Sequence, residues 1–302
     1  GVAIRSAAGA GALNVALLAG TAATNPDAVT DRRGQLRFDG TITSNGGNIA
    51  LGGAWAQVDA PGAGVFTNGA TLDSTALDPA SRGDGSITIQ GLSVRASGGG
   101  STFGEAAVDL VTTHVNSGRG ATTVTGIDAG GTGVRLAGET LLETSSGPVA
   151  ITGAGQAGPD FTGGPSDSGS GVLMDLAGGE TGSGDVTVRG LWMSGVLPGA
   201  TSAGVSVVRG AFIDAGGNLE ITGSASGPDA GVRVAGDADL GETEVRAGGH
   251  ATLRAGNNGE GAAIVIDELA GVQAGGMLNL RPGGTDGSTW ADRPADSIGL
   301  GA

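Results

Sequence analysis

Cysteine, lysine and tyrosine are absent from the 302-residue sequence, and aromatic residues make up only 3% of it. Without cysteine the chain has neither disulfide bonds nor thiolate chemistry, so packing and hydrogen bonds must stabilise it. A globular core of this size normally uses aromatic side chains to fill its centre. Their scarcity favours a thin core built from aliphatic residues.

Glycine is abundant, with 64 residues, and 30 acidic residues outnumber 15 basic ones. The glycines follow no Gly-x-y period with abundant proline, which excludes collagen. A hydrophobic fraction of 38% is too high for a disordered chain. The formal net charge of −15 repels nucleic acid and anionic lipid, so we expect no nucleic-acid partner.

Neither end of the sequence has the pattern of a targeting or membrane segment. The Ala-rich opening, residues 7–23, is interrupted by glycines and lacks the continuous apolar run of a signal peptide or membrane span. The last residues, 296–302, have the pattern of a strand that begins. We therefore expect the sequence to be a segment of a longer protein, with no membrane span.

One motif recurs eight times: two small residues, a variable residue, then apolar, polar and apolar residues shortly before a glycine. Its clearest copy is GGNLEITG at residues 216–223. The second small residue of the copies is Gly47, Gly85, Gly120, Gly147, Gly184, Gly217, Gly249 and Gly276. A second apolar element precedes each copy and begins at Gly34, Gly64, Glu105, Gly133, Gly171, Gly204, Gly231 and Ala262. A weaker apolar stretch lies between the two, as at residues 211–215.

Alternation of apolar and polar residues within each motif is typical of a strand with one buried face. In GGNLEITG we expect Leu219 and Ile221 to point inward and Glu220 outward. A single turn of such strands cannot bury its apolar face, but stacked turns pair their strands in parallel and bury a continuous column. We expect glycine at the corners to allow positive φ and close approach of successive turns.

The predicted fold is therefore an all-β, right-handed parallel β-helix, or β-solenoid, of about eight to nine turns with three short strands per turn. We expect a single domain over residues 1–302. Within it, residues 1–33 form an irregular or degenerate first turn, 34–284 the regular turns, and 285–302 the start of a further turn.

The order of elements within a turn carries a family resemblance. GV-x-V is followed by apolar-x-Ala-Gly-Gly and then by Asn-Leu-x-Ile-Thr-Gly, most clearly from Gly204 to Gly223. In this order the chain, from about Gly34 onward, resembles the filamentous haemagglutinin-like large exoproteins, whose adhesin repeats are secreted by the two-partner route. Asn25-Pro26-Asp27 matches the Asn-Pro-Asn signature of that family's secretion domain only in part, so the resemblance covers the repeat region.

The resemblance implies a right-handed parallel β-helix that is exported through an outer-membrane transporter to the surface of a Gram-negative bacterium. It also implies a role in adhesion, biofilm formation or contact-dependent inhibition. It does not indicate a particular receptor.

The one candidate binding site is the triplet Arg82-Gly83-Asp84, which resembles integrin-binding loops of some adhesins. It lies in a polar loop just before an expected strand at residues 86–89. A polar turn is the simpler interpretation in a chain so rich in glycine, arginine and aspartate, and receptor binding is the alternative.

Two rows of side chains are expected on one outer face of the stack. Arg189, Arg254 and Arg281 occupy the same motif position, with Arg95 at or near it. Thr88, Thr123, Thr187 and Thr252 share another outward position, interrupted by Ala50, Ala150, Glu220 and Asn279. We expect the arginines to offset charge or form surface ion pairs, and the interrupted threonine row not to bind ice.

Chemical sites are not evident from the residue pattern. Parallel β-helices include polysaccharide lyases and hydrolases, whose acids must gather within roughly 5 to 9.5 Å. Here the acidic candidates occupy different strand positions, namely Asp109, Asp175, Asp185, Asp214 and Asp267. We therefore predict no enzymatic activity, no cofactor and no zinc site from the two histidines, His114 and His250. Calcium remains an option at the Gly-Asp-rich turns 81–85 and 283–287. Each tryptophan, Trp55, Trp192 and Trp290, is expected to pack under a loop or at a corner.

The leading hypothesis is a structural or adhesive segment of a secreted surface exoprotein, a rigid solenoid whose loops, especially 153–170 and 96–103, meet a cell surface through a glycan or protein receptor. One alternative is a self-assembling extracellular filament, formed by end-to-end association of exposed strand edges. The other is a carbohydrate-active β-helix enzyme.

Overall fold

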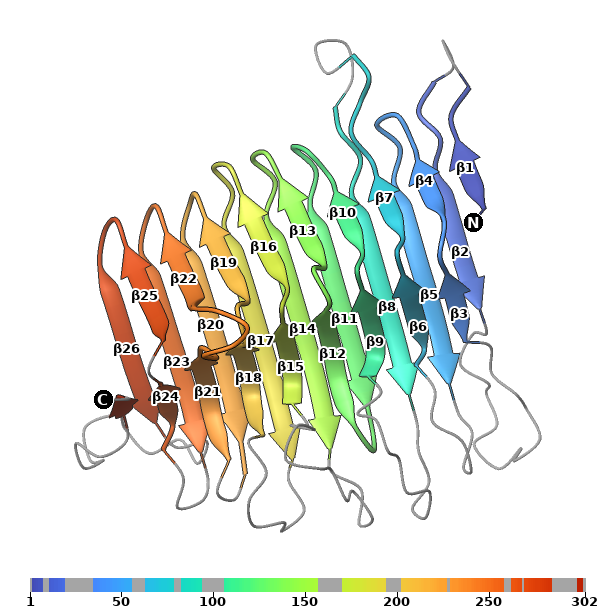
Figure 1. Cartoon of the computed structure of the whole chain (residues 1–302). Coiled ribbons are helices and arrows are strands. Elements are labelled where there is room, and N and C mark those ends of the chain that lie inside the picture. The colour runs from blue at the N-terminus through green and yellow to red at the C-terminus, as the bar shows by residue number, and fades with distance from the viewer. Residues whose placement is uncertain are drawn as a thin grey trace.

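A computed structural model shows an all-β protein with a stack of parallel strands (Figure 1). The structure describes residues 2–7, 11–19, 35–55, 63–78, 83–93, 106–156, 170–193, 202–226, 229–257, 262–267, 269–283 and 298–300. In these ranges 27 strands form three sheets of nine strands. Every turn of the chain gives one strand to each sheet, which confirms the predicted right-handed parallel β-helix.

We name the sheets A, B and C in the order in which the chain visits them. Sheet A contains β1 (Ala3–Arg5), β4 (Thr41–Thr43), β7 (Thr71–Asp73), β10 (His114–Asn116), β13 (Leu141–Thr144), β16 (Gly178–Thr181), β19 (Phe212–Ala215), β22 (Thr243–Ala247) and β25 (Ala270–Ala274). Sheet B contains β2 (Val15–Ala19), β5 (Ile49–Trp55), β8 (Ile87–Ser93), β11 (Thr122–Asp128), β14 (Val149–Gln156), β17 (Val186–Met193), β20 (Leu219–Ala225), β23 (Ala251–Asn257) and β26 (Leu278–Gly283). Sheet C contains β3 (Leu36–Phe38), β6 (Val65–Asn68), β9 (Ala106–Val111), β12 (Thr132–Ala137), β15 (Ser170–Asp175), β18 (Ala203–Val208), β21 (Ala230–Ala235), β24 (Ile264–Ile266) and β27 (Ile298–Leu300).

The repeated motif forms sheet B, and the preceding apolar element forms sheet C. Strands β1 and β2 pair with β4 and β5, so the opening residues make a ninth turn as expected. The last strand, β27, pairs with β24 in sheet C. The weak apolar stretch between the two elements forms sheet A, which has the shortest strands in several turns because the chain bends there.

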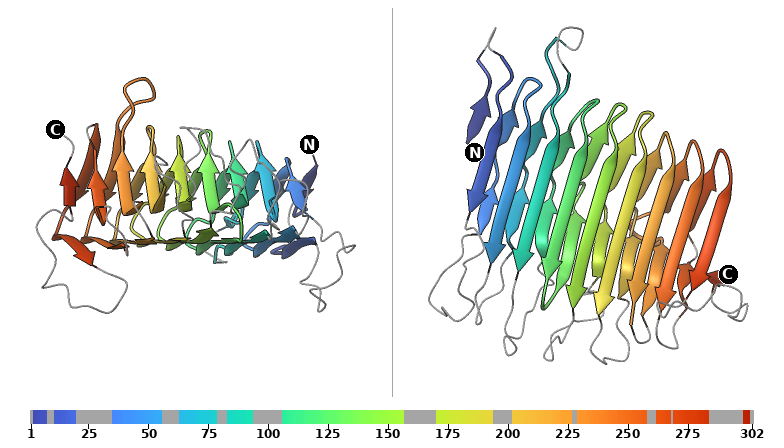
Figure 2. Two further views of the ribbon diagram at one scale, coloured as in Figure 1. Left: turned by 90° about the horizontal axis from the view of Figure 1, so that it is seen from below. Right: turned by 180° about the vertical axis from the view of Figure 1, so that it is seen from behind.

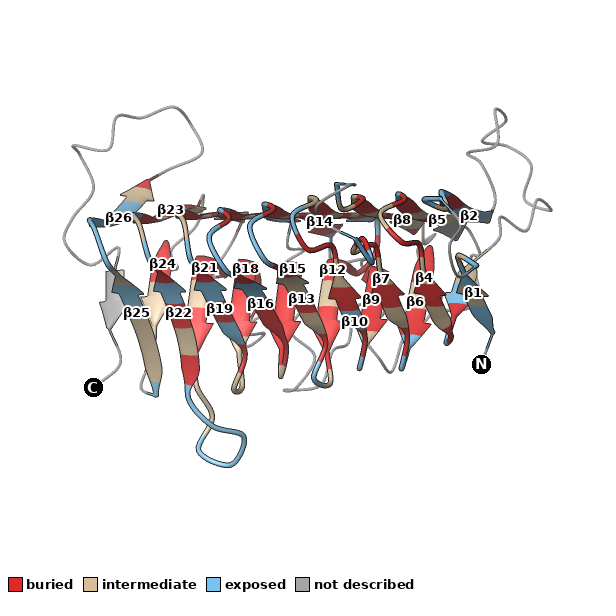
Figure 3. Ribbon diagram, turned by 90° about the horizontal axis from the view of Figure 1, so that it is seen from above, coloured by how far each residue is buried: buried red, intermediate tan, exposed pale blue. Residues whose placement is uncertain are grey.

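The three sheets make two layers. Sheet B is one flat layer. Each strand of sheet C except the last, β27, continues through a bend into a strand of sheet A in the facing layer (Figure 2 and Figure 3). At the bends the backbone adopts positive φ at non-glycine residues, namely Thr112, Glu139, Leu176, Arg209 and Leu269. This left-handed conformation is uncommon for side-chain-bearing residues, so each bend is held by the stack around it.

Inward side chains align in columns because the strands pair without a register slip. Leu219 and Ile221 are buried, whereas Glu220 is half-exposed on the outer face, as predicted. Ile221 lies between Val188 and Leu253 of the neighbouring turns in the same column. The columns merge into one continuous core cluster from Val15 to Ile264. Stacking therefore buries the aliphatic face that a single turn would leave in water.

Glycine brings the two layers together where sheet B ends and sheet C begins. A Cβ atom on Gly190 of β17 would overlap the carbonyl oxygen of Gly204 in β18, and one on Gly204 would overlap the backbone of Ser224 in β20. We call this close approach of a sheet B glycine and the sheet C backbone the glycine crossing. It recurs at Gly126 with Gly133 and in other turns. Glycine at this position is thus required for close approach of the layers from β5 to β20, whereas β23 and β26 have Ala255 and Pro282 there.

At the corners between sheets A and B, the prediction that glycine allows close approach of successive turns is confirmed. The prediction that glycine generally serves positive φ at these corners is wrong. A Cβ atom on Gly85 would overlap Gly47, and one on Gly120 would overlap Gly85. Among the described glycines of these corners, only Gly46 and Gly118 have positive φ. Crowding by the turn below is the dominant reason for glycine there.

Candidate functional site

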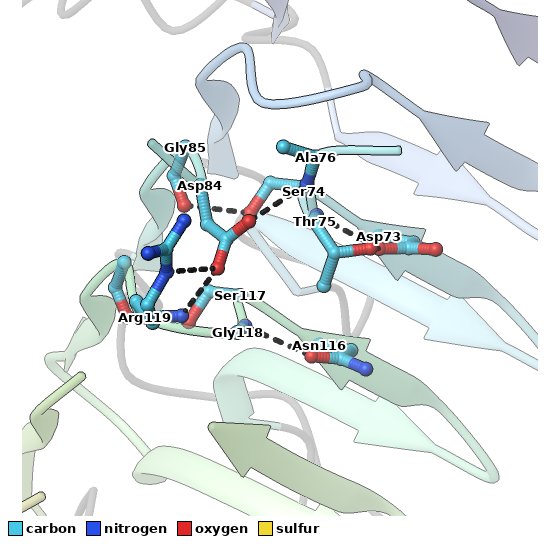
Figure 4. Close-up of polar contacts among 11 residues, drawn as sticks. Asp73, Ser74, Thr75, Ala76, Asp84, Gly85, Asn116, Ser117, Gly118 and Arg119 are labelled. Atoms are coloured by element: carbon cyan, nitrogen blue, oxygen red, sulfur yellow. Dashed lines mark hydrogen bonds and ion pairs between the residues drawn. The ribbon is translucent and has the colours of Figure 1, made fainter. Parts of the chain in front are cut away.

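The predicted Arg-Gly-Asp triplet lies between β7 and β8, where a longer connection leaves the corner of sheets A and B. Arg82 falls outside the described residues, and Gly83 is exposed. The Asp84 carboxylate points into the stack (Figure 4). Its Oδ1 atom accepts a hydrogen bond from the backbone N–H of Ala76 at 2.7 Å, and its Oδ2 atom accepts one from the backbone N–H of Arg119 at 2.8 Å.

Asp84 also pairs with the Arg119 guanidinium, at 3.3 Å between Nε and Oδ2, and only 7% of its side chain is exposed. Burial acts to raise the pKa of Asp84, but the two backbone N–H groups and the Arg119 guanidinium outweigh it, so the pKa lies below its usual value. The ionised carboxylate therefore links two turns of the stack. Receptor binding by the triplet stays a prediction, and it would compete with these internal hydrogen bonds.

Further polar side chains close the same corner. Asp73 Oδ1 accepts the backbone N–H of Thr75 at 2.9 Å, and Asn116 Oδ1 accepts that of Gly118 at 2.9 Å. In several turns a hydroxyl donates to the carbonyl oxygen of the corner glycine; the donors are Ser44, Ser74, Ser117, Thr144 and Thr181. Except at Ser74, the glycine follows three residues later. This Ser/Thr-x-x-Gly pattern is visible in the sequence and marks the corner, although the repeated strand motif does not include it.

A ladder of side chains runs along the outside of this corner. Asn48 Oδ1 accepts the backbone N–H of Ser86, and Asn218 Oδ1 accepts that of His250 at 3.0 Å. His250 continues the ladder, because its Nδ1 atom accepts the backbone N–H of Met277 at 2.9 Å. His250 is thus exposed and lies in a corner, where it makes a structural contact. The other histidine, His114, is exposed at the start of β10 and bonds Glu143 at 2.9 Å.

Three carboxylates meet arginines on the outer side of sheet C. Asp109 on β9 pairs with Arg135 on β12 at 3.1 Å, and Asp175 pairs with Arg209. Asp267 pairs with Arg233 at 2.7 Å. Burial raises the pKa of Asp109 and outweighs the opposing effect of the Arg135 guanidinium.

The remaining acidic candidates lie elsewhere. Asp185 is in a corner, where it accepts the backbone N–H of Asn218 at 2.7 Å, and Asp214 is exposed on β19 of sheet A. The described residues contain no group of three or more His, Asp or Glu side chains that could hold a metal ion. Of the turns considered for calcium, residues 83–85 and 283 are described, and the rest of 81–85 and 283–287 lies outside the described residues.

Trp192 is the one tryptophan whose side chain the structure describes. It is buried in β17, beyond the glycine crossing, and its Nε1 atom donates to Asp229 Oδ2 at 3.1 Å. It therefore packs beneath the connection between sheets B and C, as predicted. The side chains of Trp55 and Trp290 lie outside the described part of the chain.

The outer face of sheet B carries both predicted rows. Strand pairing places Arg189, Thr222, Arg254 and Arg281 in one column. It places Thr88, Thr123, Ala150, Thr187, Glu220, Thr252 and Asn279 in the next one. Arg95 lies outside the described residues. Arg189 approaches Glu220 at 3.9 Å, which confirms the expected surface ion pair there.

Connections from sheet B to sheet C vary most in length. They range from the short turn 129–131 to the segments 20–35 and 284–297, and the segments 94–105 and 157–169 are nearly as long. The first residues of the expected loop 153–170 belong to β14, which extends to Gln156, so the strand there is longer than predicted. Ser170 likewise belongs to β15, and residues 157–169 and the loop 96–103 lie outside the described residues.

Comparisons with known proteins give no match, whether to protein-family models, to curated proteins or to solved structures. The described residues include no helix that is long and apolar enough to cross a membrane. What the fold defines is a right-handed parallel β-helix, in which the inward residues serve stacking.

Proposed function

We propose that this chain is a structural and adhesive segment of a secreted bacterial surface exoprotein, a rigid solenoid that presents loops for attachment. The observation that carries the proposal is the placement of the variable connections. Most of them join the end of a sheet B strand to the start of a sheet C strand, so they leave the stack along one edge; the longer connections 74–86 and 236–242 lie elsewhere. We call this edge the loop edge.

We expect the loop edge to tolerate variation, because the glycine crossing lies on its inner side. Gly190 and Gly204 bring the layers together there, ahead of the connection 194–202, and Trp192 is buried two residues further along β17. Binding residues are commonly placed on loops that a rigid scaffold positions. Export to the surface of a Gram-negative bacterium through an outer-membrane transporter is part of the proposal and rests on the resemblance of the repeats.

The test is attachment of beads that carry the purified chain to cultured epithelial cells and to bacterial cells. We expect attachment that falls when residues 156–169 are replaced by Ala-Gly-Gly, the sequence of the short turn at 129–131. The replacement is matched in register: Ile127 pairs with Ala154 and Val134 with Val172, so the same register puts Gly155 at the place of Asp128 and Ser170 at the place of Thr132. Absence of attachment to every surface, with a folded protein, would refute the adhesive role.

A second candidate is an end-to-end filament, and the exposure of apolar side chains in the outer turns favours it. Met277 and Leu278 are 58% and 42% exposed, and Ile4 and Leu17 at the opposite end are only half-buried. Parallel strand edges at both ends allow a second copy to continue the sheets head to tail. Sedimentation over a range of concentrations tests this: growing assemblies that Leu278→Glu suppresses would support it, and a strict monomer would contradict it.

Catalysis is not part of the proposal. Asp109 and Asp175 lie on β9 and β15, with β12 between them, and each is paired with an arginine. Release of oligosaccharides from a panel of acidic and neutral glycans would overturn this view and favour a carbohydrate-active enzyme.

A further inference from the structure

The arginine row on sheet B is formed by strands of successive turns. Arg254 on β23 and Arg281 on β26 are direct neighbours in the register, and Thr222 separates Arg254 from Arg189. Neighbouring strands lie about 4.8 Å apart, so the three guanidinium groups follow the solenoid axis. All three side chains are exposed, Arg189 at 60%.

Arg254 and Arg281 are the one pair of arginines at neighbouring register positions in the described strands. Most arginines on sheets A and C have a carboxylate partner, as Arg246 has Glu244 at 2.6 Å and Arg233 has Asp267. Among the described residues Arg5 on β1 has no ion pair, and Arg37 on β3 lies over the ring of Phe66 instead. In the described part of the chain, neither Arg254 nor Arg281 forms an ion pair. Like charges side by side in a sheet are destabilising, and acidic residues outnumber basic ones two to one here. Two adjacent arginines without ion-pair partners are therefore suited to bind an anion that comes from outside the chain.

The side chains around the arginine row can form hydrogen bonds with the hydroxyl groups of a sugar. The adjacent column contributes Thr252 and Asn279, and Thr222 lies within the row itself. Hydroxyl and amide groups donate and accept hydrogen bonds, and a guanidinium group binds a carboxylate or sulfate with two parallel hydrogen bonds. The sheet face is flat along its axis (Figure 2), which suits an extended ligand.

We propose that Arg254 and Arg281, extended by Thr222 and Arg189, bind a linear acidic polysaccharide that lies along the solenoid axis. Nucleic acid does not fit, because duplex DNA carries one negative charge per about 1.7 Å and the chain has a net charge of −15. A polysaccharide presents its oxyanions at wider intervals, with hydroxyl groups between them. The proposal rests on the sheet and its side chains, so it stands or falls independently of attachment through the loop edge.

The experiment measures binding of the immobilised full chain to polygalacturonate, dextran sulfate and neutral dextran at low and physiological ionic strength. We expect binding to one or both anionic polymers, no binding to neutral dextran, and weaker binding at higher salt. Binding to polygalacturonate alone assigns carboxylate as the recognised group, and binding to dextran sulfate alone assigns sulfate. Either outcome supports the proposal.

The variant Arg254→Ala/Arg281→Ala should weaken binding by roughly tenfold, as expected for two exposed charge pairs. The matched control is Arg233→Ala/Arg246→Ala, which removes the same charge from sheets C and A and should change binding less than about twofold. Circular dichroism and thermal unfolding establish that each variant is folded. Equal losses in the two double variants, no binding to either anionic polymer, or tighter binding to single-stranded DNA would overturn the proposal.

Discussion

The two edges of sheet B, its corner with sheet A and its loop edge with sheet C, are both rich in glycine but are held together differently. At the corner, side chains bind the backbone of their own turn and of the next, as Asp84 and Asn218 do. At the loop edge, glycine lets the layers touch, and connections of unequal length lie outside that contact. The corner therefore fixes the stacking of turns, and the loop edge leaves sequence free for binding.

The largest effect is expected at the glycine crossing. Gly190→Ala places a Cβ atom against the Gly204 backbone, which no side-chain movement relieves, so the free energy of unfolding should fall by about 3 kcal/mol or more. The control is Gly271→Ala, whose Cβ would meet nothing within 4 Å. Urea unfolding monitored by circular dichroism measures both. Equal stability of the two variants would show that the crossing does not hold the layers together.

The second-largest loss in the free energy of unfolding is expected at the corner, for Asp84→Asn. This change removes the charge-assisted hydrogen bonds to Ala76 and Arg119. We expect a loss of about 1–3 kcal/mol at pH 7. Because the pKa of Asp84 is lowered on folding, its contribution is present above the carboxyl's unfolded pKa and is lost as the pH falls through the folded value. Asp214→Asn, at an exposed position on sheet A, is the control. If the two variants have the same free energy of unfolding from pH 3 to pH 7, Asp84 does not stabilise the contact between the turns.

The ladder of side chains outside the corner should contribute less to the free energy of unfolding than Asp84 does. Asn218→Ala removes the acceptor for the backbone N–H of His250, and we expect a loss of about 0.5–1 kcal/mol because the site is exposed. Asn279→Ala, on the outer face of sheet B, should cost less. Amide hydrogen exchange of His250 measures the local effect directly. Unchanged protection of that amide in Asn218→Ala would contradict the ladder.

The smallest effect is expected on sheet C, at Asp109→Asn. Burial raises the pKa of Asp109, so the ionised form is held less well in the folded chain than in the unfolded one. Its contribution to stability is therefore greatest below the unfolded pKa and declines as the pH rises through the raised folded value, the opposite of Asp84. We expect Asp109→Asn to change stability by no more than about 1 kcal/mol and to flatten this decline. A loss comparable to that of Asp84→Asn would remove the contrast between the two acids.

The repeating part of the fold was predictable from the sequence, because each motif alternates and its copies align. The inward positions of Leu219 and Ile221, the rows of arginine and threonine on sheet B and the extra turn at the amino-terminal end follow from that alignment alone. Period-two alternation fixes which face is buried, and parallel stacking then brings equivalent residues together.

The polar contacts were less predictable, because they depend on distances between turns that the spacing of motifs does not fix. The internal role of Asp84 requires its connection to fold back over Arg119, which is 35 residues later in the chain. The layer contact at Gly190 and Gly204 requires knowledge of how two strands of one turn face each other. The lack of ion-pair partners for Arg254 and Arg281 likewise depends on where the carboxylates of other turns lie.

The most direct test of the central claim is the unfolding free energy of the variant in which Ala-Gly-Gly replaces residues 156–169. If the glycine crossing and the inward columns hold the stack, this variant should match the stability of the unaltered chain to within about 1 kcal/mol. A loss as large as that of Gly190→Ala would contradict the claim and show that the connection itself holds the layers together.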